Sequence, residues 1–300
     1  MTSMSPLSRS FDATLGSARA IVPGMSSEKT KLAALTAPLQ ATPKHAINGY
    51  CAWDIPAQKG QPAWAISGWV CENDQVVPTP HIILPHAEAS IAVHQRGDNM
   101  HLLMRGPAQA PRVHKPSAGE RLIGISLTPE TMARCFRLHP PEWEQKVELA
   151  PPNLARSLEP AVESMRILPG REALKALLTA VATIVDKSEM PVSAEHYLAQ
   201  QMRARDGDLR LSGLGEQLDL SSRQTRRRFI GLMGITPKTF ARQLRLARIM
   251  TRADHHRSPA WAGLAHESGY CDQAHFVRDC RALTGRTPSQ IHANRQLQQI

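Results

Sequence analysis

Arginine is the residue type in this sequence that points most directly to a chemistry. From Glu195 to the end of the chain, 17 Lys and Arg stand against nine Asp and Glu, and 16 of those 17 cations are Arg. Residues 1–194 are nearly balanced, with 19 against 17, so most of the net charge of +10 belongs to the last third. The planar guanidinium binds phosphates and guanine edges through paired hydrogen bonds. This concentration favours a polyanionic partner over a merely solvated basic surface.

Two stretches place arginines on the outer side of a helix. At 100° per residue, a helix over residues 222–233 puts Arg223 and Arg227 opposite an apolar side, and a helix over residues 273–284 does the same with Arg278. The inward residues are Thr225, Phe229 and Leu232 in the first helix and Phe276, Cys280 and Leu283 in the second, where Ala274 and Arg281 also face outward and His275 lies at the margin. Such a helix fits a major groove about 12 Å wide.

Further cations flank these faces and are expected to hold the DNA backbone. They are Arg226, Arg228, Lys238, Arg242, Arg245 and Arg281. Phosphate contacts position a protein on DNA without reading its sequence.

An internal repeat shows how the chain positions both helices. A shift of 51 residues superposes Gly234, Thr236 and Pro237 on Gly285, Thr287 and Pro288. Capping signals predict two helix-turn-helix units: the first spans about 212–234, with helices opened by Ser212 and Ser221, and the second spans about 259–285, with helices opened by Ser258 and Asp272. A linker helix over residues 237–252, with Phe240, Leu244 and Ala247 as its apolar stripe, is expected to separate them.

The rest of the chain predicts a second domain rich in strands. Residues 1–43 have no sustained period and are expected to form a disordered leader. Within residues 44–190, short apolar runs at 64–70, 81–84, 90–94, 101–104 and 122–127 predict an antiparallel sandwich or cupin-like barrel. Helices are expected from Thr128 and over residues 171–187, the latter packed on its own sheet or used for dimerisation. The predicted fold class is a two-domain α+β protein, with an all-α domain at residues 191–300.

Composition excludes several classes of protein. No apolar run approaches the roughly 20 residues needed to span a bilayer, and no secretory signal is visible. The five cysteines form no C-x-x-C pair, which argues against a disulfide framework or a thiolate zinc site. These features predict a cytoplasmic protein with reduced thiols, and no metal, cofactor or membrane is expected.

The carboxy-terminal third resembles AraC/XylS-type transcriptional regulators. The resemblance rests on Gly263–Arg278 (GLAHESGYCDQAHFVR), Leu283–Ser289 (LTGRTPS), Gly234–Pro237 (GITP) and Phe240–Arg248 (FARQLRLAR), and covers about a hundred residues. It implies a DNA-binding domain that reads two adjacent major grooves. The positions matching the family's base-contacting sites are Arg223, Arg226 and Arg227 in the first reading helix and Ala274, His275 and Arg278 in the second. Ala274 offers no base hydrogen bond, and Cys280 replaces the family's usual aromatic and is expected to be a buried thiol.

The resemblance also extends, more thinly, to the β-rich region. Gly124–Pro129 (GISLTP) matches a landmark of regulatory domains in such proteins, whereas Ile83–His86 (ILPH) departs from their Leu-Pro-Asp-Gly. The sequence therefore predicts a sequence-specific transcription regulator, with double-stranded DNA and RNA polymerase as partners and activation slightly favoured. A small-molecule effector and a homodimer are further expectations.

Two features of the β-rich region leave alternatives open. Five histidines at positions 81, 86, 94, 101 and 114 could converge on a metal, which would make the chain a metal-dependent barrel enzyme with a DNA-binding appendage. Trp53, Trp64 and Trp69 could line an apolar pocket, although core packing is the better account. A DNA-repair protein with a reactive cysteine is a third reading, but no cysteine lies in a clustered motif.

Overall fold

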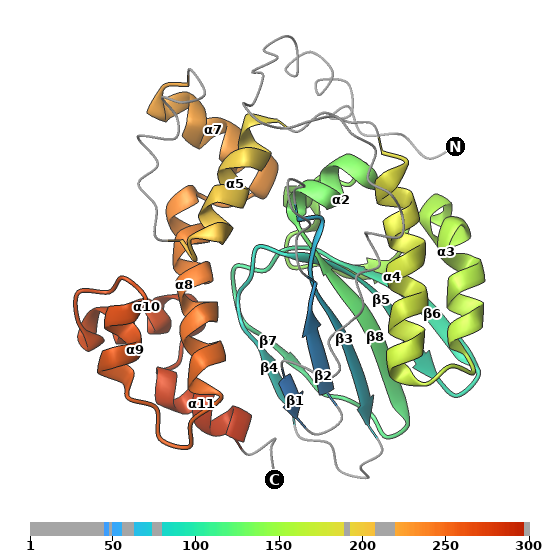
Figure 1. The fold of residues 1–300 in the computed structure, drawn as a ribbon, viewed down its shortest axis with the longest axis horizontal. Helices are drawn as coiled ribbons and strands as arrows, with labels where there is room; N and C mark the ends of the chain where they lie inside the picture. Colours follow the sequence, from blue (N-terminus) through green and yellow to red (C-terminus); the bar gives the residue numbers. More distant parts are fainter. Residues whose placement is uncertain are drawn as a thin grey trace, which may run out of the picture.

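The computed structural model of the chain describes residues 45–47, 50–55, 63–73, 80–188, 193–207 and 220–296. The predicted leader at 1–43 and the predicted helix at 212–218 lie outside the described residues. Figure 1 shows a β-rich region beside an all-helical one. The predicted fold class, sheet-rich first and helical second, is therefore confirmed.

A seven-stranded antiparallel sheet dominates the first region. Its strand order is β1-β2-β3-β8-β5-β6-β9, and β4 pairs separately with β7. The bounds are β1 (His45–Ile47), β2 (Tyr50–Asp54), β3 (Ala65–Asn73), β4 (His81–Ile83), β5 (Ala89–Arg96), β6 (Asn99–Arg105), β7 (Arg112–His114), β8 (Glu120–Leu127) and β9 (Val147–Leu149). The five predicted runs correspond to β3, β4, β5, β6 and β8. The remaining strands have only three to five residues, too few for a visible alternation.

Helices α3 (Pro152–Met165) and α4 (Gly170–Asp186) cover one face of this sheet (Figure 1). Leu174, Leu177 and Val181 of α4 are fully buried in the same core as Ile91 and Ile125 of the sheet. Of the two alternatives for this apolar face, the structure shows packing on the chain's own sheet. The sequence did not predict α3. Helix α2 (Pro129–Cys135) begins as predicted at Thr128, whose Oγ1 accepts from the Thr131 N–H at 3.2 Å.

In the part that the structure describes, the second region forms helices and no strand. They are α5 (Ala194–Ala204), α7 (Ser222–Met233), α8 (Pro237–Ala253), α9 (Trp261–Glu267), α10 (Gln273–Thr284) and α11 (Pro288–Gln296). Helix α8 has α5 and α7 at one end and α9, α10 and α11 at the other (Figure 1). It contributes residues to two small cores. Phe240 belongs to the first core with Phe229, whereas Leu246 and Ile249 belong to the second with Phe276.

Two local predictions in this region were wrong. The expected apolar stripe of α8 fails because Ala247 is exposed and Leu244 only half-buried. A single stripe cannot describe a helix that packs against a different core near each end. Helix α9 begins at Trp261, with Ala260 rather than Ser258 at its N-cap. The Trp261 ring packs against Phe276 at 6.1 Å between centroids, so the helix starts where this ring joins the second core.

The described part of the chain contains no helix that is both long enough and apolar enough to span a bilayer.

Candidate nucleic-acid interface

The first candidate reading helix, α7, is defined at both ends by its own sequence. Ser221 Oγ accepts from the Gln224 N–H at 3.3 Å, and Gln224 Oε1 accepts from the Ser221 N–H at 2.9 Å. This reciprocal capping box is the predicted one. At the other end, Gly234 takes a φ of 74°, the left-handed conformation that glycine adopts without steric cost.

The structure places the arginines of α7 on its free side. Arg223, Arg226 and Arg227 are exposed, while Thr225 and Phe229 are buried. The three arginines and Ile230 line a shallow, open depression. A second depression lies where α7 and α8 begin, between Arg226 and Lys238. The second hollow therefore carries cations close to helix N-termini, where the backbone dipole also favours anions.

The second candidate reading helix, α10, repeats this design. Asp272 Oδ1 accepts from the His275 N–H at 2.6 Å, and Gly285 ends the helix with a φ of 70°. Ala274, Arg278 and Arg281 are exposed, as predicted from the helical period. His275 is half-buried, with its ring edge-on to Tyr270 at 5.1 Å. The inward residues Phe276, Cys280 and Leu283 are all buried.

Cys280 lies in the second core. Its Sγ donates to the carbonyl of Arg286 at 3.4 Å and lies 3.8 Å from Thr284 Oγ1. Burial raises the pKa of this thiol to about 11. The side chain is thus a protonated, packed thiol.

The six cations expected at phosphates differ in how free they are. Arg226, Lys238 and Arg281 are exposed. Arg228 Nε lies 3.7 Å from Glu195 Oε1 of α5. Arg242 donates from Nε to Asp279 Oδ1 at 2.5 Å, and the Arg245 guanidinium lies 4.9 Å from the centre of the Tyr270 ring. Arg242 and Arg245 therefore already have partners inside the domain.

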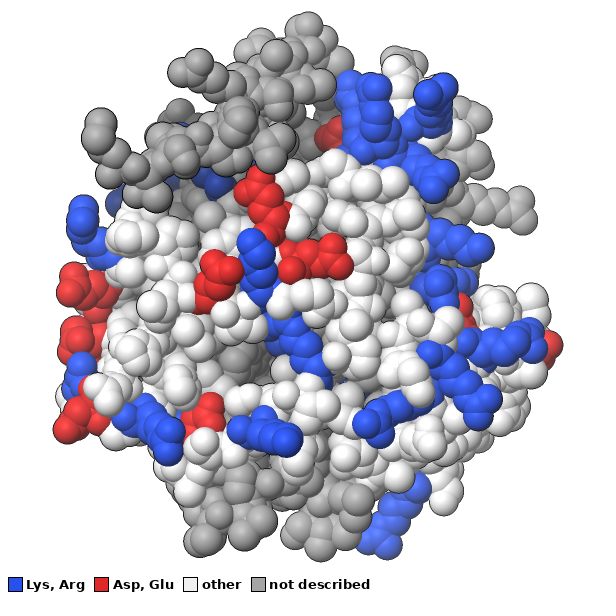
Figure 2. Space-filling model, turned by 180° about the vertical axis from the view of Figure 1, so that it is seen from behind, with Lys and Arg blue, Asp and Glu red and all other residues white. Residues whose placement is uncertain are grey.

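Lys and Arg gather along the side of the molecule that the helical region forms, where few Asp and Glu are visible (Figure 2). The charge imbalance seen in the sequence is thus also an imbalance between two sides of the surface.

Sequence reasoning missed the contacts that join the two regions. Arg203 of α5 donates to both oxygens of Glu130 of α2, at 2.6 and 2.9 Å. Burial alone would raise the pKa of Glu130, but the charge and hydrogen bonds of Arg203 bring it below its usual range. The carbonyl of Gly231, near the end of α7, accepts from His139 Nε2 at 2.7 Å. Only the charge signs in the sequence hinted at the first contact.

The sheet region also contributes to the helical cores. Ala87 packs in the first core and Leu84 against the second. Gln243 of α8 donates from Nε2 to the Ala108 carbonyl at 3.3 Å. The candidate reading helices are therefore mounted on a helical region that the sheet region touches at several points.

The histidine cluster comes together only in part. His94 Nε2 and His114 Nε2 lie 3.2 and 3.7 Å from the same oxygen of Glu120, while His86 instead donates from Nδ1 to the Glu88 carbonyl at 2.9 Å. The described residues contain no group of three or more His, Cys, Asp or Glu that could hold a metal ion. Of the three tryptophans, Trp53 and Trp64 belong to the sheet core, and the Trp69 ring covers Gly124.

Comparison with known proteins identifies one region by family. Residues 214–294 match the model of a helix-turn-helix domain. No curated protein matches the chain. Ten chains of solved structures match it, and three of them illustrate the similarity. The first is ToxT from Vibrio cholerae O395, which is 9% identical over 82% of this chain and 98% of that chain, with a TM-score of 0.39. The second is unsaturated fatty acid-bound ToxT from Vibrio cholerae strain SCE256, which is 9% identical over 83% of this chain and 96% of that chain, with a TM-score of 0.37.

The third is the xylose-binding transcription activator xylR, at 13% identity over 41% of this chain and 39% of that chain, with a TM-score of 0.27. All these identities and scores are low, so the helix-turn-helix domain is the part of the chain whose family is assigned.

Proposed function

We propose that the chain is an AraC-type, DNA-binding transcription regulator, and that α7 and α10 of its helix-turn-helix domain, which spans residues 214–294, read two adjacent major grooves. One observation carries the proposal. The two helices have equal lengths of 12 residues and matching caps, and they present exposed arginines from the two ends of one 17-residue helix, α8. At 1.5 Å per residue that helix spans about 25 Å.

Five side chains are proposed to contact bases. They are Arg223, Arg226 and Arg227 in α7 and His275 and Arg278 in α10. The four arginines are exposed, and Arg223, Arg227 and Arg278 lie opposite the buried sides of their helices, which supports this assignment; His275 is half-buried at the margin of α10. Arg pairs with the N7 and O6 acceptors of guanine, and Ala274 adds no hydrogen bond. The first unit should therefore read more bases than the second.

Lys238, Arg281 and Arg228 are proposed to hold phosphates. Lys238 borders the hollow where α8 begins, so its ammonium group and the helix dipole would act on the same anion. Arg228 would exchange its ion pair with Glu195 for a phosphate. These contacts should add affinity without adding sequence preference.

The sheet region is proposed to sense a signal and pass it to the helices. We place the boundary between the two domains, 44–190 and 191–300, just before α5, which begins at Ala194. The contacts of Glu130 and His139 with the helical region support coupling between the two parts. A small-molecule effector, a homodimer, RNA polymerase as partner and a cytoplasmic location belong to the same proposal.

The proposal is tested by mapping the DNA that the protein binds across the genome of its source, and then titrating purified protein on the recovered sites. Discrete peaks that share a motif over about two helical turns are expected. Arg227→Ala and Arg278→Ala should each cost about 1 to 3 kcal/mol at one base pair. Lys238→Ala should instead weaken binding to all sequences alike and lower the slope against salt by about one. Equal losses on specific and random DNA for all three variants would contradict the reading assignment.

A further inference from the structure

We propose that Arg242 and Asp279 are positioning residues that fix the second reading helix, α10, on the linker helix α8, and so set the separation of DNA half-sites that the protein accepts. This inference rests on the proposed function, and it replaces the sequence-based expectation that Arg242 binds a phosphate.

The first support is that both carboxylate oxygens of Asp279 accept a hydrogen bond. One oxygen accepts from Arg242 Nε at 2.5 Å, and the other accepts from the Tyr270 hydroxyl at 2.9 Å. The side chains of Arg242 and Asp279 are only 23% and 11% exposed. A carboxylate held on both oxygens by a charged and a neutral donor has one orientation, and so does the helix that carries it.

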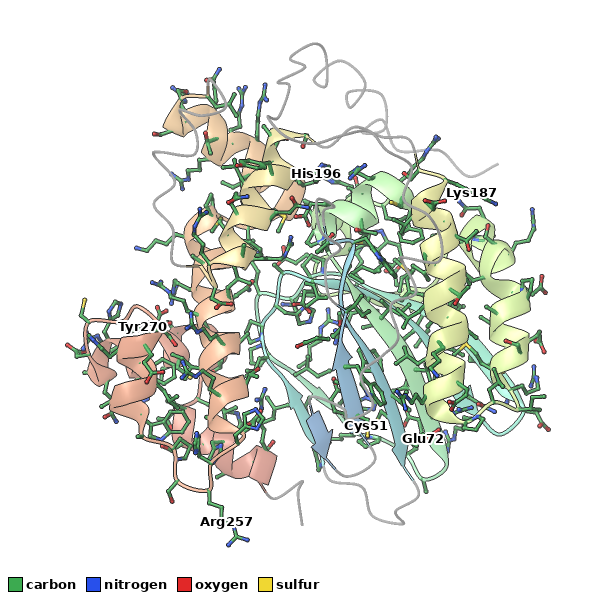
Figure 3. All side chains as sticks on the ribbon, in the orientation of Figure 1. Cys51, Glu72, Lys187, His196, Arg257 and Tyr270 are labelled. Atoms are coloured by element: carbon green, nitrogen blue, oxygen red, sulfur yellow. The ribbon has the colours of Figure 1, made fainter. Side chains whose placement is uncertain are left out.

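A second contact of α8 supports the same arrangement. Arg245, one helical turn beyond Arg242, lays its guanidinium over the ring of Tyr270 at 4.9 Å. That ring also packs against His275 at 5.1 Å and Phe276 at 5.3 Å, both on α10. Burial, together with Asp279, raises the pKa of Tyr270, so its hydroxyl remains a donor. Figure 3 shows Tyr270 among the side chains of the helical region, beside α10.

These contacts control where the reading residue points. Asp279 directly follows Arg278, so the anchored carboxylate fixes the helix rotation that turns Arg278 outward. At its other end, α8 packs Phe240 against Phe229 of α7, with 5.5 Å between the ring centres. One helix thus fixes both reading helices before DNA arrives. Preorganisation of this kind removes part of the ordering cost of binding.

The phosphate-contact alternative predicts the opposite response to one substitution. If Arg242 served as a phosphate contact, Asp279→Asn would release it, remove a negative charge and strengthen binding to all DNA. If Arg242 and Asp279 position α10, the same substitution weakens binding to an operator that contains both half-sites, one for α7 and one for α10. It leaves binding to DNA with the α7 half-site alone unaffected.

The experiment compares Asp279→Asn with Glu267→Gln on the operator recovered by mapping. Glu267 is a matched control, because it lies in the same unit and pairs with Arg252, but both side chains are about half exposed. We expect Asp279→Asn to lose about tenfold in affinity for the full operator, and Glu267→Gln to lose nothing. Inserting one base pair between the half-sites should abolish most wild-type binding and penalise Asp279→Asn less.

Two further variants separate positioning from folding. Arg242→Lys retains a cation that can reach Asp279 and should recover part of the affinity lost in Arg242→Met. Tyr270→Phe keeps the ring but removes one hydrogen bond, so it tests the same network if Asp279→Asn does not fold. Binding of Asp279→Asn, or in that case Tyr270→Phe, equal to that of Glu267→Gln would overturn the inference. A wild-type protein with no preference for two half-sites over one would instead overturn the proposed function.

Discussion

Glu130 and Arg203 form a two-pronged ion pair between α2 of the sheet region and α5 of the helical region, with N···O distances of 2.6 and 2.9 Å. The side chains are only 7% and 14% exposed. Arg203 also lies 5.2 Å from the ring of Phe240, a member of the first helical core. The pair therefore connects the start of α2 to the core on which the first reading helix is built.

Substituting Glu130→Gln should destabilise the protein strongly. It leaves the buried guanidinium of Arg203 without a counter-charge, which lowers the free energy of unfolding by roughly 3 to 5 kcal/mol. Urea unfolding would measure the loss. Glu163→Gln is the control, because Glu163 pairs with Arg166 on the surface, and its unfolding midpoint should not move. A Glu130→Gln protein as stable as Glu163→Gln would mean that the two regions are not joined in this way.

The same interface should make the protein sensitive to acid. Burial lowers the pKa of His196 to about 4. The nearby carboxylates of Glu130 and Glu195 raise this pKa, while the charges of Arg134 and Arg203 lower it further. Its Nδ1 accepts from the Ser193 N–H at 3.1 Å, a bond that protonation would remove. Because the unfolded chain takes up this proton first, the free energy of unfolding falls as the pH drops from about 6.5 towards 4.

His196→Gln isolates this contribution. Glutamine at this position can still accept from the Ser193 N–H, but it does not titrate. Between pH 7 and pH 5 the wild type should lose about 2 kcal/mol through His196, and the variant should lose correspondingly less. Thermal unfolding at several pH values would measure both slopes. Parallel slopes for the two proteins would show that His196 is not held neutral by burial.

The signals that predicted the two reading helices were local. Ser221 with Gln224, Asp272, and the glycines at 234 and 285 define helix ends through contacts within a few residues of sequence. The helical period then sufficed to place Arg227 and Arg278 on the outside. Local patterns carry this information because caps and helical faces depend on near neighbours.

The partners of the arginines could not be predicted in this way. Arg242 and Asp279 are separated by 37 residues, and Arg203 and Glu130 by 73. Whether an outward arginine meets DNA or a carboxylate depends on how distant elements pack, which no periodicity records. The short strands β7 and β9 were missed for a related reason, since each pairs with a strand far along the chain, β7 with β4 and β9 with β6.

The two cysteines of the second unit should differ sharply in reactivity. Cys271 is exposed, whereas Cys280 is buried with its pKa raised to about 11. Since the thiolate is the nucleophile, iodoacetamide at pH 8 should label Cys271 readily and Cys280 only after unfolding. Peptide mass spectrometry would follow both sites, with Cys271→Ser as the control for assignment. Labelling of both thiols at similar rates in the folded protein would contradict the packing of the second core.

Two glycines of the second unit test the helix ends, because the same substitution should have opposite effects. An added Cβ would meet nothing within 4 Å at either Gly263 or Gly285. Gly263 lies within α9, so Gly263→Ala should raise the free energy of unfolding by about 0.4 to 1 kcal/mol. Gly285 has a φ of 70° at the end of α10, so Gly285→Ala should lower it by about 1 kcal/mol. Urea midpoints that shift in the same direction would show that α10 does not end in a left-handed residue.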